Sequence, residues 1–265
     1  MLLLLGLALV VSSIGFYRVV YFISIGYAFS IVAMAIITPL RYIENLTWAS
    51  ASQNMLLVLW GARLGIYLVQ REFRASYRKG LSSVHQRFAE MAWGIKTLIW
   101  ISVSLLYVLM FSPSLFVLTS SSATSSWITD LVQIVGLVIM GGGLVLEAAA
   151  DKQKSDFKAE FPKRYCDVGL YRWVRCPNYL GEIIFWVGNW IVGVMAYTSS
   201  LKWITSLVGL VCIVLIMIGS TRRLEIGQDK RYGDQPRYQE YVRTVPVLFP
   251  FVPVYSLKKI CVFWD

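Results

Sequence analysis

An amide and a carboxylate stand where an apolar helix is expected to begin. The stretch RCPNYLGE, residues 175–182, closes a basic, aromatic-rich loop and leads into the apolar IIFWVGNW. Proline suits the first turn of a helix, so Pro177 predicts a helix start. Asn178 and Glu182 are four residues apart and share one face of that helix. Because such groups are costly at the edge of an apolar segment unless they bind something, this face is a candidate binding site.

A second pair of acids precedes that loop. Glu147 and Asp151 are four residues apart, and Lys154 and Lys158 continue the helical spacing. Glu147 lies inside an apolar run, after GGGLVL, and such small residues permit the close approach of a helix or a ligand. Solvated charges stabilised by pairs four residues apart are the alternative interpretation.

A third polar stripe lies earlier in the chain, in the segment LWGARLGIYLVQR. Arg63, Tyr67 and Arg71 follow one another at intervals of four residues. Arg63 is near the middle of an apolar stretch, where an arginine is expected to face the interior of a helix bundle. A paired or snorkelling arginine beside a core tyrosine would give the same pattern.

Composition predicts an all-α, polytopic membrane protein. Of 265 residues, 57% are hydrophobic, and they occur in long blocks. Leu2–Phe16 lacks a basic start and a small-residue cleavage site, which favours a retained helix. We expect a single membrane domain, 1–265, with about seven transmembrane helices: 2–16, 19–38, 51–69, 95–118, 128–149, 180–197 and 203–220.

The distribution of basic residues predicts the orientation of the bundle. Three basic segments follow the third, fifth and seventh predicted helices, and lysine and arginine are typical of cytoplasmic loops. The N-terminus is therefore expected outside and the C-terminus in the cytoplasm. The net charge of +10 fits loops that face anionic lipid. Apart from this charge, nothing in the sequence supports a nucleic-acid partner. The scattered cysteines and the single histidine, His85, indicate neither disulfides nor a metal site.

The chain resembles the DUF1295 branch of the steroid 5-alpha-reductase C-terminal superfamily. The segments that carry the resemblance are LWGARLGIYLVQR, the acid pair, GLYRWVRCPNYLGEIIFWVGNW and RYQEYVRTVPVLFP. The resemblance implies an NADPH-dependent oxidoreductase that acts on a carbon–carbon double bond conjugated to a carbonyl in a lipophilic substrate. It also implies that 1–127 form the substrate side and 128–265 the cofactor-binding part, open to the cytoplasm.

The resemblance assigns roles to individual residues. Asn178 and Glu182 match the family motif N-[YF]-x-G-E and are implied to bind the nicotinamide-ribose end of NADPH. The basic loops are expected to bind the phosphates. Tyr67 roughly matches a substrate-carbonyl tyrosine. Further implied cofactor residues are Glu147, Asp151, Lys158, Tyr165, Arg175 and either Arg222 or Arg223.

The expected chemistry places Tyr67 as proton donor to the substrate carbonyl, with Arg63 assisting it. The chain departs from the family in having Cys176 where histidine is usual, and its stretch YFISIGYAF, residues 21–29, lacks the aspartate that the branch often carries near the N-terminus. It also has no counterpart to the glutamate that the steroid reductases use on the substrate carbonyl. Two alternatives stay open. One is a membrane methyltransferase that uses S-adenosylmethionine, because the R-x-P-x-Y-x-G element of these enzymes is also satisfied by Arg175, Pro177, Tyr179 and Gly181. The other is a non-catalytic lipid-binding relative. Plasma membrane and endoplasmic reticulum fit equally, and the sequence does not indicate an oligomeric state.

Overall fold

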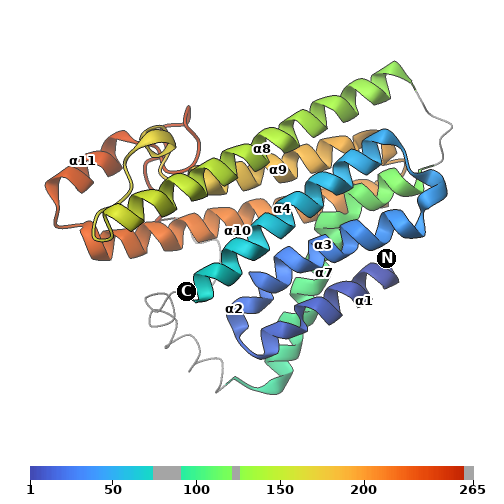
Figure 1. Cartoon of the computed structure of the whole chain (residues 1–265), viewed down its shortest axis with the longest axis horizontal. Coiled ribbons are helices and arrows are strands. Elements are labelled where there is room, and N and C mark those ends of the chain that lie inside the picture. The colour runs from blue at the N-terminus through green and yellow to red at the C-terminus, as the bar shows by residue number, and fades with distance from the viewer. Residues whose placement is uncertain (74–90, 121–125, 260–265) are drawn as a thin grey trace. The chain divides into compact units, whose positions relative to one another are not determined.

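The computed structural model describes residues 1–73, 91–120 and 126–259, and this part of the chain is helical, with no strand (Figure 1). The basic segment predicted after the third helix lies largely outside the described residues, with Arg74, Arg78 and Lys79. The single histidine, His85, also lies outside them. The helices, in chain order, are α1 (Leu2–Ser12), α2 (Val19–Phe22), α3 (Ile25–Arg41), α4 (Trp48–Glu72), α7 (Trp93–Thr119), α8 (Trp127–Glu160), α9 (Pro177–Val192), α10 (Ser200–Tyr232) and α11 (Pro236–Thr244). Short 3₁₀ turns are η1 (Ser13–Phe16), η2 (Ile43–Asn45), η4 (Gly169–Arg172) and η5 (Val194–Ala196).

Five described segments are long and apolar enough to cross a membrane: Val19–Arg41, Trp93–Thr119, Trp127–Glu160, Pro177–Ala196 and Ser200–Tyr232. They confirm a helical membrane protein, whereas the predicted count of seven is not confirmed. The apolar Leu2–Phe16 is too short, because its helix α1 has 11 residues and spans only about 17 Å. Helix α4 has 25 residues and is long enough to cross a membrane, but because of its polar side chains it is not apolar enough to count among these five segments.

The chain divides into two compact units. Unit 1 comprises Met1–Leu137 and Asn189–Leu210, and unit 2 comprises Val138–Gly188 and Val211–Asp265. In unit 1, α3 packs along α4 and α1. Gly61 of α4 permits the approach to α3, since a Cβ there would lie 2.8 Å from the Ala28 carbonyl oxygen. Thr47 and Ser50 start α4 with a reciprocal capping box.

A buried polar layer explains the polar residues of α4. Gln53 Nε2 donates to Asn189 Oδ1 at 2.9 Å, and Asn189 Nδ2 donates to the Met110 carbonyl at 3.2 Å. Ser114 Oγ donates to Asn54 Oδ1 at 3.0 Å. Gln53 and Asn189 are almost fully buried. These side chains link α4 to α7 and to the end of α9, as hydrogen bonds between membrane helices do.

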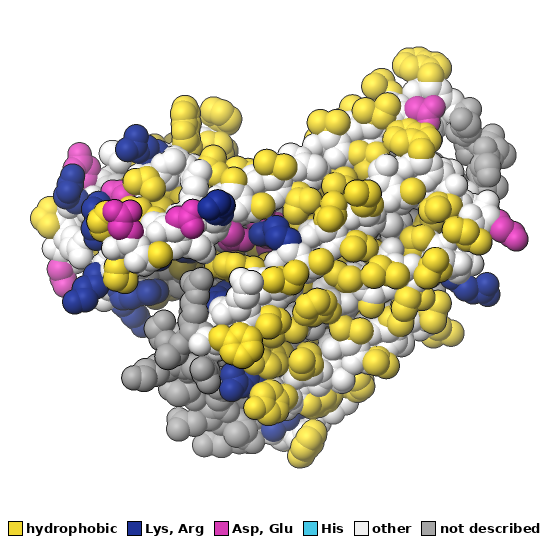
Figure 2. Space-filling model, viewed as in Figure 1, with side chains coloured by type: hydrophobic (Ala, Val, Ile, Leu, Met, Phe, Trp, Pro, Cys, Tyr) yellow, Lys and Arg dark blue, Asp and Glu magenta, His cyan; other side chains and the backbone are white. Residues whose placement is uncertain are grey.

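Unit 2 contains the C-terminal parts of α8 and α10, the α8–α9 connection, most of α9, α11 and the tail after α11. A tyrosine cluster joins these parts: Tyr165, from the α8–α9 connection, packs against Tyr232, Tyr238 and Tyr241, with ring centroids 5.1–5.8 Å apart. Charged side chains gather around α11 (Figure 2). Unit 2 therefore combines apolar helix segments with a charged end.

Candidate functional site

Helices α8 and α9 touch through their backbones. A Cβ on Gly143 would lie 2.4 Å from the Phe185 backbone nitrogen, and one on Gly181 would lie 2.6 Å from the backbone nitrogen of Glu147. Gly143 and Glu147 on α8, like Gly181 and Phe185 on α9, are four residues apart and so share one face. This contact fixes Glu147 against the residue that precedes Glu182.

Three predicted acids are buried in this part of unit 2. The exposed fractions are 2% for Glu147, 8% for Asp151 and 6% for Glu182. Each of the three makes interactions of its own in the protein. Buried carboxylates are retained at a high desolvation cost. Their concentration on two touching helices makes this the strongest candidate site in the described part of the chain.

Asn178 supplies an acceptor at the same helix start. Helix α9 begins at Pro177, as the sequence predicts, so Asn178 lies in its first turn. The Oδ1 atom of Asn178 is buried and accepts no hydrogen bond from any described residue. A buried acceptor left unsatisfied costs about 1–3 kcal/mol. A ligand that donates a hydrogen bond at this point would remove that cost.

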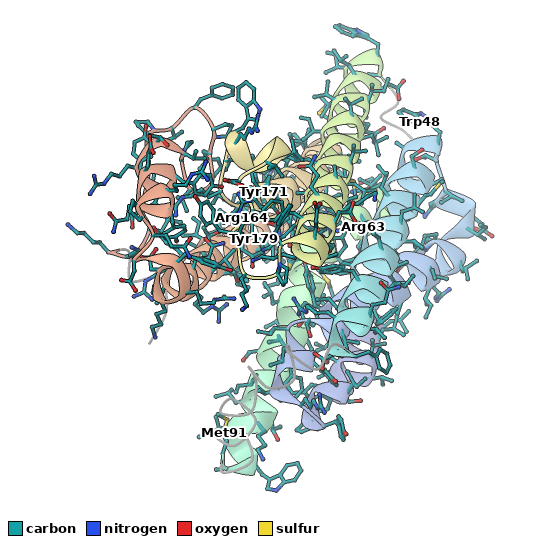
Figure 3. All side chains as sticks on the ribbon, turned by 60° about the vertical axis from the view of Figure 1, so that its left-hand side comes forward. Trp48, Arg63, Met91, Arg164, Tyr171 and Tyr179 are labelled. Carbon is teal, nitrogen blue, oxygen red and sulfur yellow. The ribbon has the colours of Figure 1, made fainter. Side chains whose placement is uncertain are left out.

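Lys158 lies in the last turn of α8, and Tyr165 lies in the connection that follows it. The Nζ of Lys158 donates to the Tyr232 hydroxyl at 2.9 Å and to the carbonyl of Arg164. Lys158 thus ties the end of α8 to the connection that follows it and to Tyr232 at the end of α10. Tyr165 is buried in the tyrosine cluster, and this burial raises the pKa of its hydroxyl. Figure 3 shows Arg164, Tyr171 and Tyr179 on this connection and at the start of α9.

Arg175 is engaged in a buried ion pair. Its Nη2 lies 3.2 Å from Glu225 Oε1, and the two side chains are 2% and 1% exposed. The same Nη2 donates to the Tyr255 carbonyl, and Glu225 Oε2 accepts from the Leu257 N–H at 2.9 Å. Arg175 was predicted to bind cofactor, yet here its guanidinium joins the loop before α9 to α10 and to the tail.

Arg222 and Arg223 have different surroundings. Arg222 Nε donates to the Lys258 carbonyl at 3.2 Å and so holds the tail. Arg223 is exposed, and its guanidinium donates to Ser220 Oγ at 3.1 Å. Of the two arginines that the sequence could not separate, Arg223 is the one whose charge faces outward.

The two predicted catalytic residues belong to unit 1. Arg63 and Tyr67 lie four residues apart on α4 and are both half-buried. Tyr67 packs with Leu64 against a cluster of Tyr21, Ile25 and Leu68. The nine predicted cofactor residues all belong to unit 2, and its predicted acids and Asn178 lie on α8 and α9, the two helices that touch at Gly143 and Gly181.

Cys176 is expected to be unreactive in the folded protein. Its thiol is buried directly before α9, and burial raises its pKa from the ordinary 9.0 to about 11. The thiolate that reacts with alkylating agents is therefore scarce at neutral pH. We expect mass spectrometry after treatment with N-ethylmaleimide to find Cys176 unmodified in the native protein and modified after denaturation. Rapid labelling of the native protein would contradict this burial.

Comparison with known proteins identifies relatives but no solved counterpart. A family model described as "Protein of unknown function (DUF1295)" matches residues 10–245. "Uncharacterized protein C594.04c" of Schizosaccharomyces pombe is 34% identical over 82 residues, which are 31% of this chain and 22% of that protein. The chain thus spans well under two thirds of that relative. No solved structure matches.

Proposed function

Because the chain belongs to the DUF1295 family, within the steroid 5-alpha-reductase-like superfamily, we propose that it is a membrane-embedded, NADPH-dependent reductase. Its substrate would be a lipophilic molecule with a carbon–carbon double bond conjugated to a carbonyl, such as a steroid-like or lipid enone. The observation that carries this proposal is that the buried acids Glu147 and Glu182 and the unsatisfied Asn178 oxygen lie on two helices that touch, α8 and α9.

The donor and acceptor pattern of this site fits the nicotinamide-ribose end of NADPH. That end offers an amide N–H and ribose hydroxyls, all hydrogen-bond donors, and carboxylate and amide oxygens accept from them. Asn178, Glu147 and Glu182 would hold it, with Asp151 one turn further along α8. The exposed Arg223 would contribute a charge-assisted hydrogen bond to a phosphate. NADPH, when bound, supplies the hydride.

The chain's own catalytic contribution would come from α4. Negative charge grows on the carbonyl oxygen of an enone as its β-carbon is reduced, and a placed donor must stabilise it. We propose Tyr67 as that donor and proton source, with Arg63 one turn earlier adding positive charge. A lipophilic substrate would enter from the lipid. The positive-inside rule favours a cofactor site on the cytoplasmic face.

Ligand-dependent stabilisation tests the proposed cofactor. NADPH is expected to raise the melting temperature of the purified protein, since a ligand that binds only the folded state stabilises it. The Asn178→Leu and Glu182→Gln variants should lose most of this shift, whereas Glu160→Gln, which changes an exposed acid at the end of α8, should keep it. Equal shifts in all variants would remove the site assignment.

S-adenosylmethionine is the comparison ligand in the same assay. Arg175, the first residue of the R-x-P-x-Y-x-G element of the membrane methyltransferases, is paired with Glu225. Stabilisation by S-adenosylmethionine and not by NADPH would favour methyl transfer. If neither ligand shifts the melting temperature, a non-catalytic lipid-binding role is favoured. Where NADPH does bind, Tyr67→Phe should abolish enone reduction without reducing the shift, with the exposed Tyr17→Phe as control.

A further inference from the structure

The tail after α11 turns back to the α8–α9 connection (Figure 1). The backbone N–H of Arg175 donates to the Pro246 carbonyl at 2.9 Å, and the N–H of Val247 donates to the Val254 carbonyl at 2.9 Å. Leu248 and Leu257 are buried, with exposed fractions of 2% and 6%. The two ends of residues 247–257 are therefore fixed to unit 2, and a short loop projects between them.

The projecting loop is apolar and exposed. Phe251 is 92% exposed, and its apolar neighbours Phe249, Val252, Val254 and Tyr255 are between 36% and 45% exposed. Pro250 and Pro253 alternate with them. Exposed apolar side chains gathered in so short a segment mark an interaction site.

The contacts that fix the loop place it at the edge of the membrane. Arg175 lies two residues before Pro177, the first residue of a membrane-spanning segment. Glu225 and Arg222, which hold Leu257 and Lys258, lie just beyond the apolar part of α10. About 20 helical residues cross the hydrocarbon core, so a helix of 33 residues extends past it near these positions.

The charged and aromatic residues near the loop are also typical of the edge of a membrane. Lys258 and Lys259 follow the loop's fixed end and are exposed, and the Nζ of Lys258 is paired with Asp229 Oδ2. Trp173 is 69% exposed in the connection that leads to Arg175. Tryptophan is typical of the membrane–water interface, and exposed lysine and arginine beside apolar side chains are typical of segments that bind anionic lipid.

We propose that residues 249–255 form an interfacial loop that inserts into the headgroup region of the membrane the protein spans, with the exposed Lys259 contacting the phosphate of an anionic lipid. Phe251 is the deepest side chain. The buried Arg175–Glu225 pair holds the loop at this depth and connects it to the start of α9. This loop is separate from the binding site at the α8–α9 contact.

A fluorophore at position 251 tests the insertion. The Phe251→Cys variant, with Cys212 and Cys261 changed to serine, is labelled and placed in nanodiscs of phosphatidylcholine that contain a lipid with a shallow nitroxide. The buried Cys166 and Cys176 are protected from labelling. We expect several-fold stronger quenching at position 251 than in the matched Gln239→Cys protein, whose label sits on the exposed side of α11. Equal quenching at the two positions would overturn the insertion.

A change in lipid composition tests whether the loop prefers anionic lipid. Replacing part of the phosphatidylcholine by phosphatidylserine is expected to increase quenching at position 251, and the Lys259→Gln protein, in which the Lys258–Asp229 ion pair is kept, should lose that increase. An increase that survives in this variant, or no increase at all, would overturn the role of Lys259. Absence of quenching in every lipid would leave the loop in water and refute the proposal as a whole.

Discussion

Replacing Gly143 by alanine is expected to destabilise unit 2 by about 1–3 kcal/mol, because the new methyl group would overlap the backbone of α9. The Phe185 nitrogen and the Gly181 carbonyl oxygen would lie 2.4 and 2.7 Å from it, and neither can move independently of its helix. The two helices must separate, and Glu147 moves away from Gly181 as they do. Thermal unfolding of the purified protein would show the loss, and weaker binding at the candidate site should accompany it.

The neighbouring glycine provides the control. Gly142 lies one residue earlier on α8, and a Cβ on it would have no neighbour within 4 Å. Alanine is favoured over glycine inside a helix by roughly 0.5–1 kcal/mol, so Gly142→Ala should leave stability unchanged or raise it. Similar losses for the two variants would show that helix α8 is not packed through Gly143.

Breaking the Arg175–Glu225 pair is expected to cost about 3–5 kcal/mol, because a single substitution leaves the other charge buried without its partner. In Arg175→Met the carboxylate of Glu225 keeps the Leu257 N–H but loses the guanidinium. In Glu225→Leu the guanidinium keeps only the Tyr255 carbonyl. Both variants should release the tail, and limited proteolysis should then cleave it between α11 and residue 259.

The double variant distinguishes a lost ion pair from lost packing. Replacing both partners by apolar residues leaves no uncompensated charge and is often close to neutral. Arg175→Met/Glu225→Leu should therefore be more stable than either single variant. A loss equal to the sum of the two single losses would mean that the pair is not coupled.

The parts of the fold that follow from local patterns were predictable. Long apolar blocks predict α7, α8 and α10, and Pro177 predicts the start of α9. Helix α4 shows the limit of this approach. The sequence indicates a helix there, but the partners of Gln53 and Asn54 lie more than 50 residues away in the chain. No local pattern indicates whether such groups face lipid or a neighbouring helix.

The site was predictable to a similar extent. Spacing alone groups Glu147 with Asp151 and Asn178 with Glu182, but it does not show that the two helices touch. Three successive glycines precede Glu147 on α8, and only the folded structure shows that Gly143 makes the contact. The pairing of Arg175 with Glu225 joins residues 50 positions apart, and neither residue carries a signal of the other.

The return of the tail to a buried charge pair has a practical consequence for anyone who shortens or tags this protein. A chain ended after α11 would keep every helix of the described residues and nearly all of the matched family region, residues 10–245. It would nevertheless open the Arg175–Glu225 pair to water, since the Tyr255 carbonyl and the Leu257 N–H would be gone. Affinity tags are therefore better placed at the N-terminus, or after a spacer that begins beyond Lys259.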